Sequence, residues 1–208
     1  MLARLHLVTD DGVLDAPGFG ERAQRVLAAH GGAVAVHLRG HGFSAAGLFR
    51  LAEELAFATD ATGTEFLVND RVDVALAAGA DGVQLGRRSL PVAAARRLLG
   101  ADAWIGYSAH SAEEAAEAEA AGADFVVLGT IYPSASHPGE GGAGVELVRE
   151  TVARVGVPVL AIGGITPERV GEVLSAGAYG VAVLSGVWRA ADPVAAAAGY
   201  LAALGGGS

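Results

Sequence analysis

The sequence predicts an α/β fold, a TIM (β/α)₈ barrel, formed by residues 1–204 as one domain. Two observations lead to this prediction: eight short apolar segments alternate with eight longer amphipathic or alanine-rich segments, and several short segments are apolar at every position. Parallel strands that are buried on both faces have this continuous apolar character. Eight strand–helix pairs in roughly 205 residues suit a compact barrel. Residues 205–208 are expected to form a flexible tail.

The expected strands and helices alternate along the whole chain. The strands cover residues 4–9, 33–39, 65–68, 82–85, 104–107, 125–129, 158–162 and 180–184. The helices cover residues 19–30, 44–59, 71–79, 91–99, 111–121, 144–155, 167–176 and 192–204. Four helices follow a residue whose side chain can cap the first turn, namely Ser44, Ser111, Thr166 and Asp192. Glu114 stands three residues after Ser111, which is the spacing of a capping box.

One short sequence recurs where a helix gives way to a strand. Variants of Ala-Gly-Ala-Asp occupy residues 78–81, 121–124 and 176–179. In each, the glycine can take the left-handed conformation that ends a helix, and a buried strand follows. The alternative fold, an open doubly wound sheet, would usually have a glycine-rich fingerprint after its first strand. Residues 9–12, Thr-Asp-Asp-Gly, lack one.

The composition excludes several classes of function. With 23 acidic and 14 basic residues the net charge is −9, so the basic footprint of a nucleic-acid-binding protein is missing. Every basic residue is an arginine, which excludes Schiff-base aldolases, pyridoxal-phosphate enzymes and P-loop NTPases. Without cysteine there is no thiolate nucleophile, thiolate metal site or disulfide. Since no apolar run approaches ~20 residues and the first residues do not resemble a secretion signal, we expect a cytoplasmic protein without a membrane partner.

In a barrel the loops that follow the strands carry the chemistry. Gly163 and Gly164 follow the seventh expected strand, Leu184 ends the eighth, and Ser185 follows it. Backbone N–H groups at helix starts bind anions, and barrels commonly hold phosphate at these two positions. We therefore expect these four residues to bind phosphate. The simpler alternative is a pair of tight glycine turns without a ligand.

Polar side chains also follow the second and third expected strands. Alternation along the strand puts His37 and Arg39 on one side, together with His41, where they suit an anionic substrate. A solvated loop that pairs with nearby acids is the alternative. Asn69 can hydrogen-bond a ring or a carboxylate. Asp70 can either bind Mg²⁺ or cap the next helix, and we favour the cap.

The fifth and sixth loops complete the candidate site. Ser108 and His110 follow the fifth strand, and an imidazole titrates near neutral pH, so His110 can move protons. The sixth loop is the longest on this side, and its glycines would let it close as a lid. Its hydroxyls at Thr130, Ser134 and Ser136 can reach phosphate. The alternatives are a surface histidine and a disordered loop.

At these positions the chain resembles, essentially from end to end, the superfamily of thiamine phosphate synthase and the TenI-type thiazole tautomerase. The matching segments include Leu7-Val8-Thr9-Asp10, His37-Leu38-Arg39, Asn69-Asp70-Arg71, Ser108-Ala109-His110, Ile162-Gly163-Gly164 and Leu184-Ser185-Gly186. The resemblance implies a TIM barrel that binds a small thiazole phosphate. It does not by itself choose between the two branches.

Three departures from the synthase pattern bear on that choice. The synthase has Gln-Leu-Arg-x-Lys after its second strand, where this chain has residues 37–41, His-Leu-Arg-Gly-His. It has an aspartate after its fourth strand, where this chain has Ser89, and Thr-x-Thr-Lys in its sixth loop, where residues 134–137 read Ser-Ala-Ser-His. Two lysines and one acid that hold pyrophosphate and Mg²⁺ in the synthase are missing, and a histidine is a poor substitute for a fixed ammonium group.

The resemblance with these departures favours the tautomerase branch, an isomerase of thiamine biosynthesis. It implies conversion of a dihydrothiazole carboxylate phosphate into the aromatic thiazole, without a metal or other cofactor. His110 would act as acid and base, His37, Arg39 and Asn69 would bind the carboxylate and ring, and the glycine loops would hold the phosphate.

Two other functions stay open at this point. One is a thiamine phosphate synthase that joins thiazole phosphate and aminopyrimidine pyrophosphate, with an unusual pyrophosphate site that uses histidines and Asp70, which would bind Mg²⁺. The other is a non-catalytic phosphate-ligand binding or regulatory protein. Association into a homo-oligomer is compatible with all three.

Overall fold

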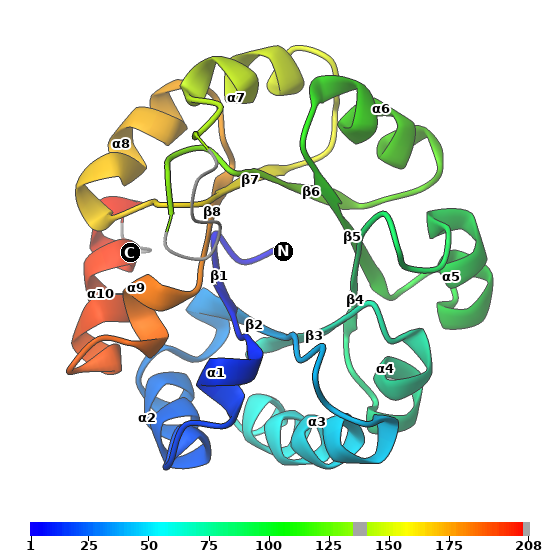
Figure 1. Cartoon of the computed structure of the whole chain (residues 1–208), viewed down its shortest axis with the longest axis vertical. Helices are drawn as coiled ribbons and strands as arrows, with labels where there is room; N and C mark the ends of the chain where they lie inside the picture. Colours follow the sequence, from blue (N-terminus) through cyan, green and yellow to red (C-terminus); the bar gives the residue numbers. More distant parts are fainter. Residues whose placement is uncertain (135–140, 206–208) are drawn as a thin grey trace.

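The computed structural model describes residues 1–134 and 141–205, and in it eight parallel strands close into a barrel (Figure 1). The strands are β1 (Leu5–Val8), β2 (Val34–Leu38), β3 (Glu65–Asn69), β4 (Gly82–Leu85), β5 (Trp104–Ala109), β6 (Phe125–Gly129), β7 (Val159–Ile162) and β8 (Gly180–Val183). Each strand pairs with the next along the chain and β8 pairs with β1. The predicted TIM barrel is confirmed.

A ring of helices surrounds the barrel (Figure 1). They are α1 (Asp11–Leu14), α2 (Phe19–His30), α3 (Ala45–Asp60), α4 (Val72–Ala78), α5 (Val92–Leu99), α6 (Ala112–Ala120), α7 (Val145–Val152), α8 (Pro167–Ser175), α9 (Ser185–Trp188) and α10 (Pro193–Ala203), with the 3₁₀ turn η1 (Gly31–Ala33). The short helices α1 and α9 were not expected from the sequence. Within the described residues, none of the helices has the length and apolar character needed to cross a membrane.

Two apolar cores hold the barrel together, one outside and one inside the strands. The outer core lies between strands and helices and includes Leu7, Val36 and Leu128, none of which is exposed. The inner core lies within the barrel and includes Leu67 and Phe125. Because every strand has packing on both faces, the continuously apolar segments form buried parallel strands.

The helix starts confirm three of the four expected caps. Ser44 and Ser111 accept hydrogen bonds from Gly47 N and Glu114 N at 3.1 Å, and Asp192 accepts from two N–H groups of α10. The expected cap by Thr166 is wrong, because its side chain accepts no hydrogen bond from a backbone N–H group of the helix. Its hydroxyl instead lies beside the Glu168 carboxylate and lowers the pKa of that group.

The expected capping box is also wrong. The Glu114 carboxylate accepts a hydrogen bond from the backbone N–H of His110, with an N···O distance of 2.8 Å, and not from that of Ser111. It also pairs with Arg87 at 2.5 Å. Although partial burial acts to raise the pKa of Glu114, these two contacts outweigh it, so the pKa is lowered. Glu114 therefore fixes the backbone of the fifth loop where His110 begins.

The recurring Ala-Gly-Ala unit has two structural roles. Its glycines, Gly79, Gly122 and Gly177, all have positive φ and end their helices as expected. In two copies the following aspartate also joins neighbouring strands: Asp81 accepts a hydrogen bond from Phe66 N, and Asp124 accepts one from Ile105 N, both at 2.7 Å. These carboxylates tie strands together at the N-terminal end of the barrel, away from the loops expected to carry chemistry.

Candidate active site

A cavity of about 530 Å³ opens at the C-terminal ends of the strands. It brings together residues from loops far apart in the sequence. The predicted site residues that line it are His37, Arg39, Asn69, Ser108, His110, Thr130, Ser134, Gly163, Gly164, Leu184 and Ser185. Ser136 and His137 lie outside the described residues, as does part of the loop expected to act as a lid. Asp70 is not part of the cavity wall but directly follows Asn69, which is.

The floor of the cavity has a polar half and an apolar half. The polar half comes from four consecutive strands, β2 to β5, and consists of His37, Asn69, Gln84 and Ser108. The apolar half comes from the other strands and consists of Val127, Ile162, Ala182 and Val8. Gln84 donates from Nε2 to Ser108 Oγ at 2.9 Å. The cavity can therefore hydrogen-bond one ligand group on one side and pack against an apolar ring on the other.

The two glycines after β7 are required by close packing as well as by backbone conformation. Gly163 and Gly164 have φ angles of 100° and 59°, which side chains rarely adopt. A Cβ atom on Gly163 would lie 2.4 Å from Thr130 Cγ2, and one on Gly164 would lie 2.5 Å from the Pro133 carbonyl oxygen. The sixth loop thus packs directly on the seventh, which puts Thr130 beside the expected phosphate cradle.

Arg169 also lines the cavity, and sequence reasoning did not find it. Its Nη1 donates to the Gly164 carbonyl oxygen at 2.7 Å, and its guanidinium lies 4.5 Å from the centre of the Tyr132 ring. Burial and the Glu172 carboxylate raise the pKa of Tyr132 to about 12, so the phenol stays neutral. The signal in the sequence was a cation in the first turn of the helix after the Gly-Gly loop.

The side chain of His110 lines the cavity and is fixed by a hydrogen bond to the backbone of β6. Its Nδ1 lies 2.6 Å from the Gly129 carbonyl oxygen. Because a carbonyl can only accept, Nδ1 carries the hydrogen, and in the neutral ring Nε2 has the free lone pair. The hydrogen bond joins the fifth loop to the end of β6.

The three polar groups after β2 do not form one cluster. His37 is 1% exposed and points into the barrel, and Arg39 lines the cavity. The His41 side chain is 47% exposed, and its Nδ1 lies 3.9 Å from Asp70 Oδ2. Strand alternation ends with β2 at Leu38, so it does not carry His41 to the same side. Among the described residues, none of the ion pairs involves Arg39.

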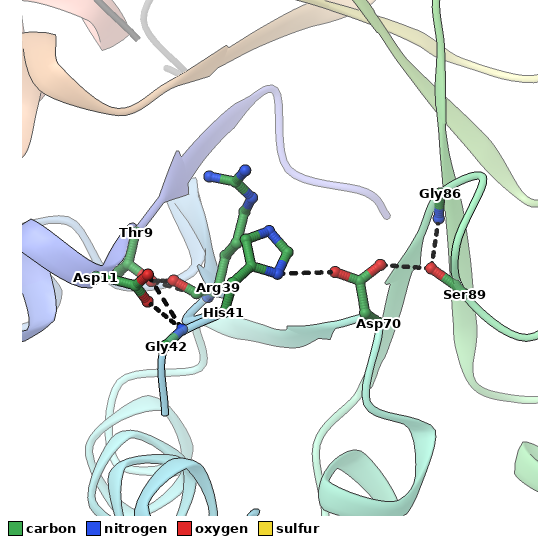
Figure 2. A network of polar contacts seen from close by, with 8 residues as sticks. All are labelled: Thr9, Asp11, Arg39, His41, Gly42, Asp70, Gly86 and Ser89. Atoms are coloured by element: carbon green, nitrogen blue, oxygen red, sulfur yellow. Dashed lines mark hydrogen bonds and ion pairs between the residues drawn. The ribbon is translucent and has the colours of Figure 1, made fainter. Parts of the chain in front are cut away.

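Asp70 does not cap the next helix, so that expectation is wrong. Arg71 holds the cap position of α4, without a side-chain bond to the helix. Asp70 has a φ of 64°, and its Oδ1 accepts a hydrogen bond from Ser89 Oγ. Ser89 is fixed in turn by the backbone N–H of Gly86, at 2.8 Å. Figure 2 shows the resulting row of groups, with His41 on one side of the carboxylate and Ser89 on the other.

The Asp70 carboxylate fits a Mg²⁺ ion that is shared with a phosphorylated ligand. No cluster of three or more His, Asp or Glu side chains occurs in the described part of the chain, so a cage of protein ligands alone is absent there. Mg²⁺ usually keeps several waters and binds one or two carboxylates together with substrate phosphates. Asp70 supplies one carboxylate, whose Oδ2 lies 3.9 Å from Nδ1 of the His41 ring.

Known proteins similar to this chain are named as synthases. A thiamine-phosphate synthase of Methanoregula boonei is 45% identical over 194 residues, which are 93% of this chain and 89% of that protein. A thiamine-phosphate synthase of Chlorobium luteolum is 44% identical over 176 residues, 84% of this chain and 83% of that protein. A solved structure, thiamine phosphate pyrophosphorylase from Pyrococcus furiosus, superposes with a TM-score of 0.85 at 35% identity and covers 97% of this chain and 95% of its own.

These comparisons overturn the expectation of an isomerase, and the tautomerase reading is wrong. Taken alone, the missing lysines and acid indicate that the chain has lost the site for pyrophosphate and Mg²⁺. Arg39 lines the cavity, and Asp70 is held by Ser89, the residue that replaces the acid. A cation and a carboxylate are therefore still present. The proton-shuttle role of His110 belonged to the tautomerase reaction and is withdrawn with it.

The family relationship follows from the whole chain and not from one motif. A family model described as thiamine monophosphate synthase matches residues 5–187, which include every strand of the barrel and both of its glycine loops. This protein belongs to that family.

Proposed function

We propose that this protein is a thiamine-phosphate synthase, a transferase that joins thiazole phosphate to aminopyrimidine pyrophosphate and releases pyrophosphate. The observation that carries the proposal is the long, high-identity match to proteins of that name. The cavity supports it, because glycine loops line one side and Arg39 and Asn69 line the other, where Asn69 is directly followed by the Asp70 carboxylate.

The thiazole phosphate would bind at the loops after β7 and β8. Gly163 and Gly164 bring backbone close to the ligand, and Ser185 adds a hydroxyl and an N–H group at the same wall. Arg169 supplies a positive charge there, fixed by the Gly164 carbonyl group and the Tyr132 ring. Backbone N–H groups and a guanidinium bind phosphate without any lysine.

The pyrophosphate would bind across the barrel, near the loops after β2, β3 and β4. In an eight-stranded ring these strands lie opposite β6, β7 and β8, as Figure 1 shows. Arg39 would pair with the pyrophosphate oxygens, and Asp70 would hold the Mg²⁺ ion. When bound, Mg²⁺ would neutralise charge on the pyrophosphate and make it a better leaving group.

Anchoring two anionic ends on opposite walls would bring the two rings together over the cavity floor. The reaction forms a bond from the thiazole ring nitrogen to the carbon that carries the pyrophosphate, and the carbon–oxygen bond to that group breaks. Holding both reactants in place removes much of the entropic cost of a bimolecular reaction. The polar half of the floor would orient the aminopyrimidine, and the apolar half would exclude water.

The test is direct synthesis with purified protein. Wild type with both substrates and Mg²⁺ should form thiamine phosphate and pyrophosphate in equal amounts. Asp70→Asn should lower kcat by about 100-fold or more, since it removes a charge that acts on the leaving group. Asp73→Asn is the matched control, because Asp73 is an exposed aspartate that pairs with Arg71 on the surface. Absence of product with wild type would overturn the proposal.

A second variant tests the thiazole-phosphate wall separately. Arg169→Ala should raise the KM of thiazole phosphate about tenfold and leave the KM of aminopyrimidine pyrophosphate within about twofold. Arg149→Ala is the control, because Arg149 pairs with Glu146 on the surface of α7. Equal changes in both KM values would contradict the division of the cavity into two anion sites.

A further inference from the structure

Two histidines lie in contact inside the barrel, below the cavity. His6 on β1 and His37 on β2 are 0% and 1% exposed. His6 Nδ1 lies 2.7 Å from His37 Nε2, and His6 Nε2 lies 2.9 Å from the Ala3 carbonyl oxygen. Ala3 is itself held by its N–H bond to the Glu65 carboxylate, at 3.0 Å. The two rings thus form a chain of hydrogen bonds that runs from the N-terminal end of the barrel strands to the cavity floor.

The hydrogen positions along this chain follow from its fixed end. The Ala3 carbonyl can only accept, so His6 Nε2 carries a hydrogen. In a neutral His6 ring Nδ1 is then an acceptor, and the short contact requires a hydrogen on His37 Nε2. In a neutral His37 ring Nδ1 is left with a lone pair. Histidine tautomers are set by such partners of the other ring nitrogen.

Both rings are neutral at physiological pH. Burial lowers the pKa of His6 to about 4, against a smaller opposing effect of the Ala3 carbonyl. Burial also lowers the pKa of His37 well below its ordinary value, and the adjacent His6 ring lowers it further, while the nearby Asn69 side chain opposes this. A proton on either ring would be desolvated and close to the other ring.

The chain ends in two acceptor atoms at the cavity. His37 Nδ1 and Asn69 Oδ1 are both buried without a hydrogen-bond partner in the part of the chain described, and both residues line the cavity wall. A buried polar atom without a partner costs about 1–3 kcal/mol, so such atoms usually mark a ligand or water site. A third buried acceptor without a partner in the part of the chain described, Gln84 Oε1, lies beside Gly106. A primary amine on a heteroaromatic ring has two N–H groups, which matches the acceptor pair on the neighbouring strands β2 and β3.

We propose that His6 is a positioning residue that fixes the His37 tautomer, so that His37 Nδ1 and Asn69 Oδ1 accept the two N–H groups of a heteroaromatic primary amine. The inference rests on the proposed function, whose aminopyrimidine substrate carries such an amine. His6 does not touch the ligand. It determines whether His37 presents an acceptor or a donor to it.

The tautomer can be measured without substrate. In protein labelled with ¹⁵N-histidine, His37 Nδ1 should have the chemical shift of an unprotonated nitrogen and Nε2 that of a protonated one. Addition of 4-aminopyrimidine should shift the Nδ1 resonance, and 4-methylpyrimidine, which has no N–H donor, should not. A protonated Nδ1 in the free protein would overturn the proposal. The proposal would also be overturned if the His37 Nδ1 resonance shifted in Asn69→Ala but did not shift on addition of 4-aminopyrimidine. In that case the Asn69 amide, and not a ligand amine, would be the donor to Nδ1.

Variants of His6 separate positioning from packing. His6→Phe keeps an aromatic ring at this position but removes the acceptor, so it should allow the other His37 tautomer and raise the KM of aminopyrimidine pyrophosphate about tenfold. His6→Asn places an amide oxygen near the position of Nδ1, so it should keep the His37 tautomer and stay within about threefold of the wild-type KM. His30→Phe is the control, since His30 bonds a carbonyl oxygen of α10, outside the barrel.

The outcomes distinguish this inference from the proposed function. If wild type makes thiamine phosphate and His6→Phe changes neither the His37 tautomer nor the KM, the inference fails and the function stands. If wild type makes no product, the function fails, and the nitrogen shifts with 4-aminopyrimidine still decide whether the acceptor pair binds an amine. If His6→Phe does not fold, His6→Asn and the wild-type spectrum decide the question.

Discussion

The hydroxyl group of Ser89 donates a hydrogen bond to the Asp70 carboxylate, so the end of β4 supports an acid at the end of β3. Asp70 has a left-handed backbone conformation, which is uncommon for a residue with a side chain. The contact with Ser89 therefore fixes the direction of the carboxylate on a residue whose backbone conformation is itself unusual.

The first prediction concerns Mg²⁺ dependence at this pair. Ser89→Ala should raise the Mg²⁺ concentration for half-maximal activity about threefold to tenfold, because Asp70 loses the bond that orients it. Ser89→Asp should lower that concentration, because a second carboxylate adds an oxygen ligand. Ser175→Ala is the control, since Ser175 only bonds within α8. Identical Mg²⁺ titrations of the wild type and both Ser89 variants would contradict this role.

The second prediction concerns stability in mild acid. The folded pKa of His6 is about 4, below its ordinary value of 6.5. Above pH 6.5 neither state binds the proton and the full stability is present. As the pH falls below 6.5 the unfolded chain binds a proton that the folded protein refuses, so this contribution is lost progressively toward pH 4. Between pH 7 and 5 the loss is about 2 kcal/mol for His6. Urea unfolding at pH 7 and 5 measures it, and His6→Phe should show a smaller difference than wild type.

A third prediction compares two glycines. Gly106 lies inside the barrel, where a Cβ atom would come within 2.2 Å of Gln84 Oε1 and 2.3 Å of Phe125 Cζ. Gly106→Ala should lower the free energy of unfolding by about 3 kcal/mol, because a packed interior cannot take the methyl group. Gly171 is exposed within α8, with open space around it. Gly171→Ala should raise the free energy of unfolding by about 0.5–1 kcal/mol. Thermal unfolding of both variants gives the comparison, and similar changes in the two would be inconsistent with it.

A fourth prediction concerns the carboxylate at the closed end of the barrel. Asp124 accepts from Ile105 N at 2.7 Å and from Arg96 at 2.5 Å. Asp124→Ala should destabilise the fold by about 2 kcal/mol, since the N–H group of the buried Ile105 loses its acceptor. Glu113→Ala, which removes an exposed surface pair with Arg154, should leave the free energy of unfolding close to that of the wild type. In both variants the KM values should stay at the wild-type level, and a change in them would show that this end of the barrel is coupled to the cavity.

The fold could be predicted from the sequence because its signals are long and repeated. Eight apolar strands, three Ala-Gly-Ala turns and the capping serines agree with one another. The helices α1 and α9 were missed because each is a single turn of four residues, too short to show a helical period. Thr166 stands at a helix start but bonds elsewhere, which no spacing rule reveals.

The candidate site could be predicted as a set of residues, but not every member of it. A barrel brings the ends of its strands together, so loop residues such as Arg39 and Gly164 were found from position alone. His6 and Gln84 were missed because they lie within strands whose two faces are both apolar, so the sequence does not show which face points inward. The choice of reaction was wrong because missing lysines were visible in the sequence, whereas the contact between Asp70 and Ser89 was not.

The carboxylates of Asp81 and Asp124 join neighbouring strands at the end of the barrel opposite the cavity. Because these contacts lie far from the cavity, side chains at the C-terminal ends of the strands can change without weakening the contacts that keep the barrel closed. The same separation makes the mouth of the barrel the place where substitutions for a new ligand would disturb the fold least.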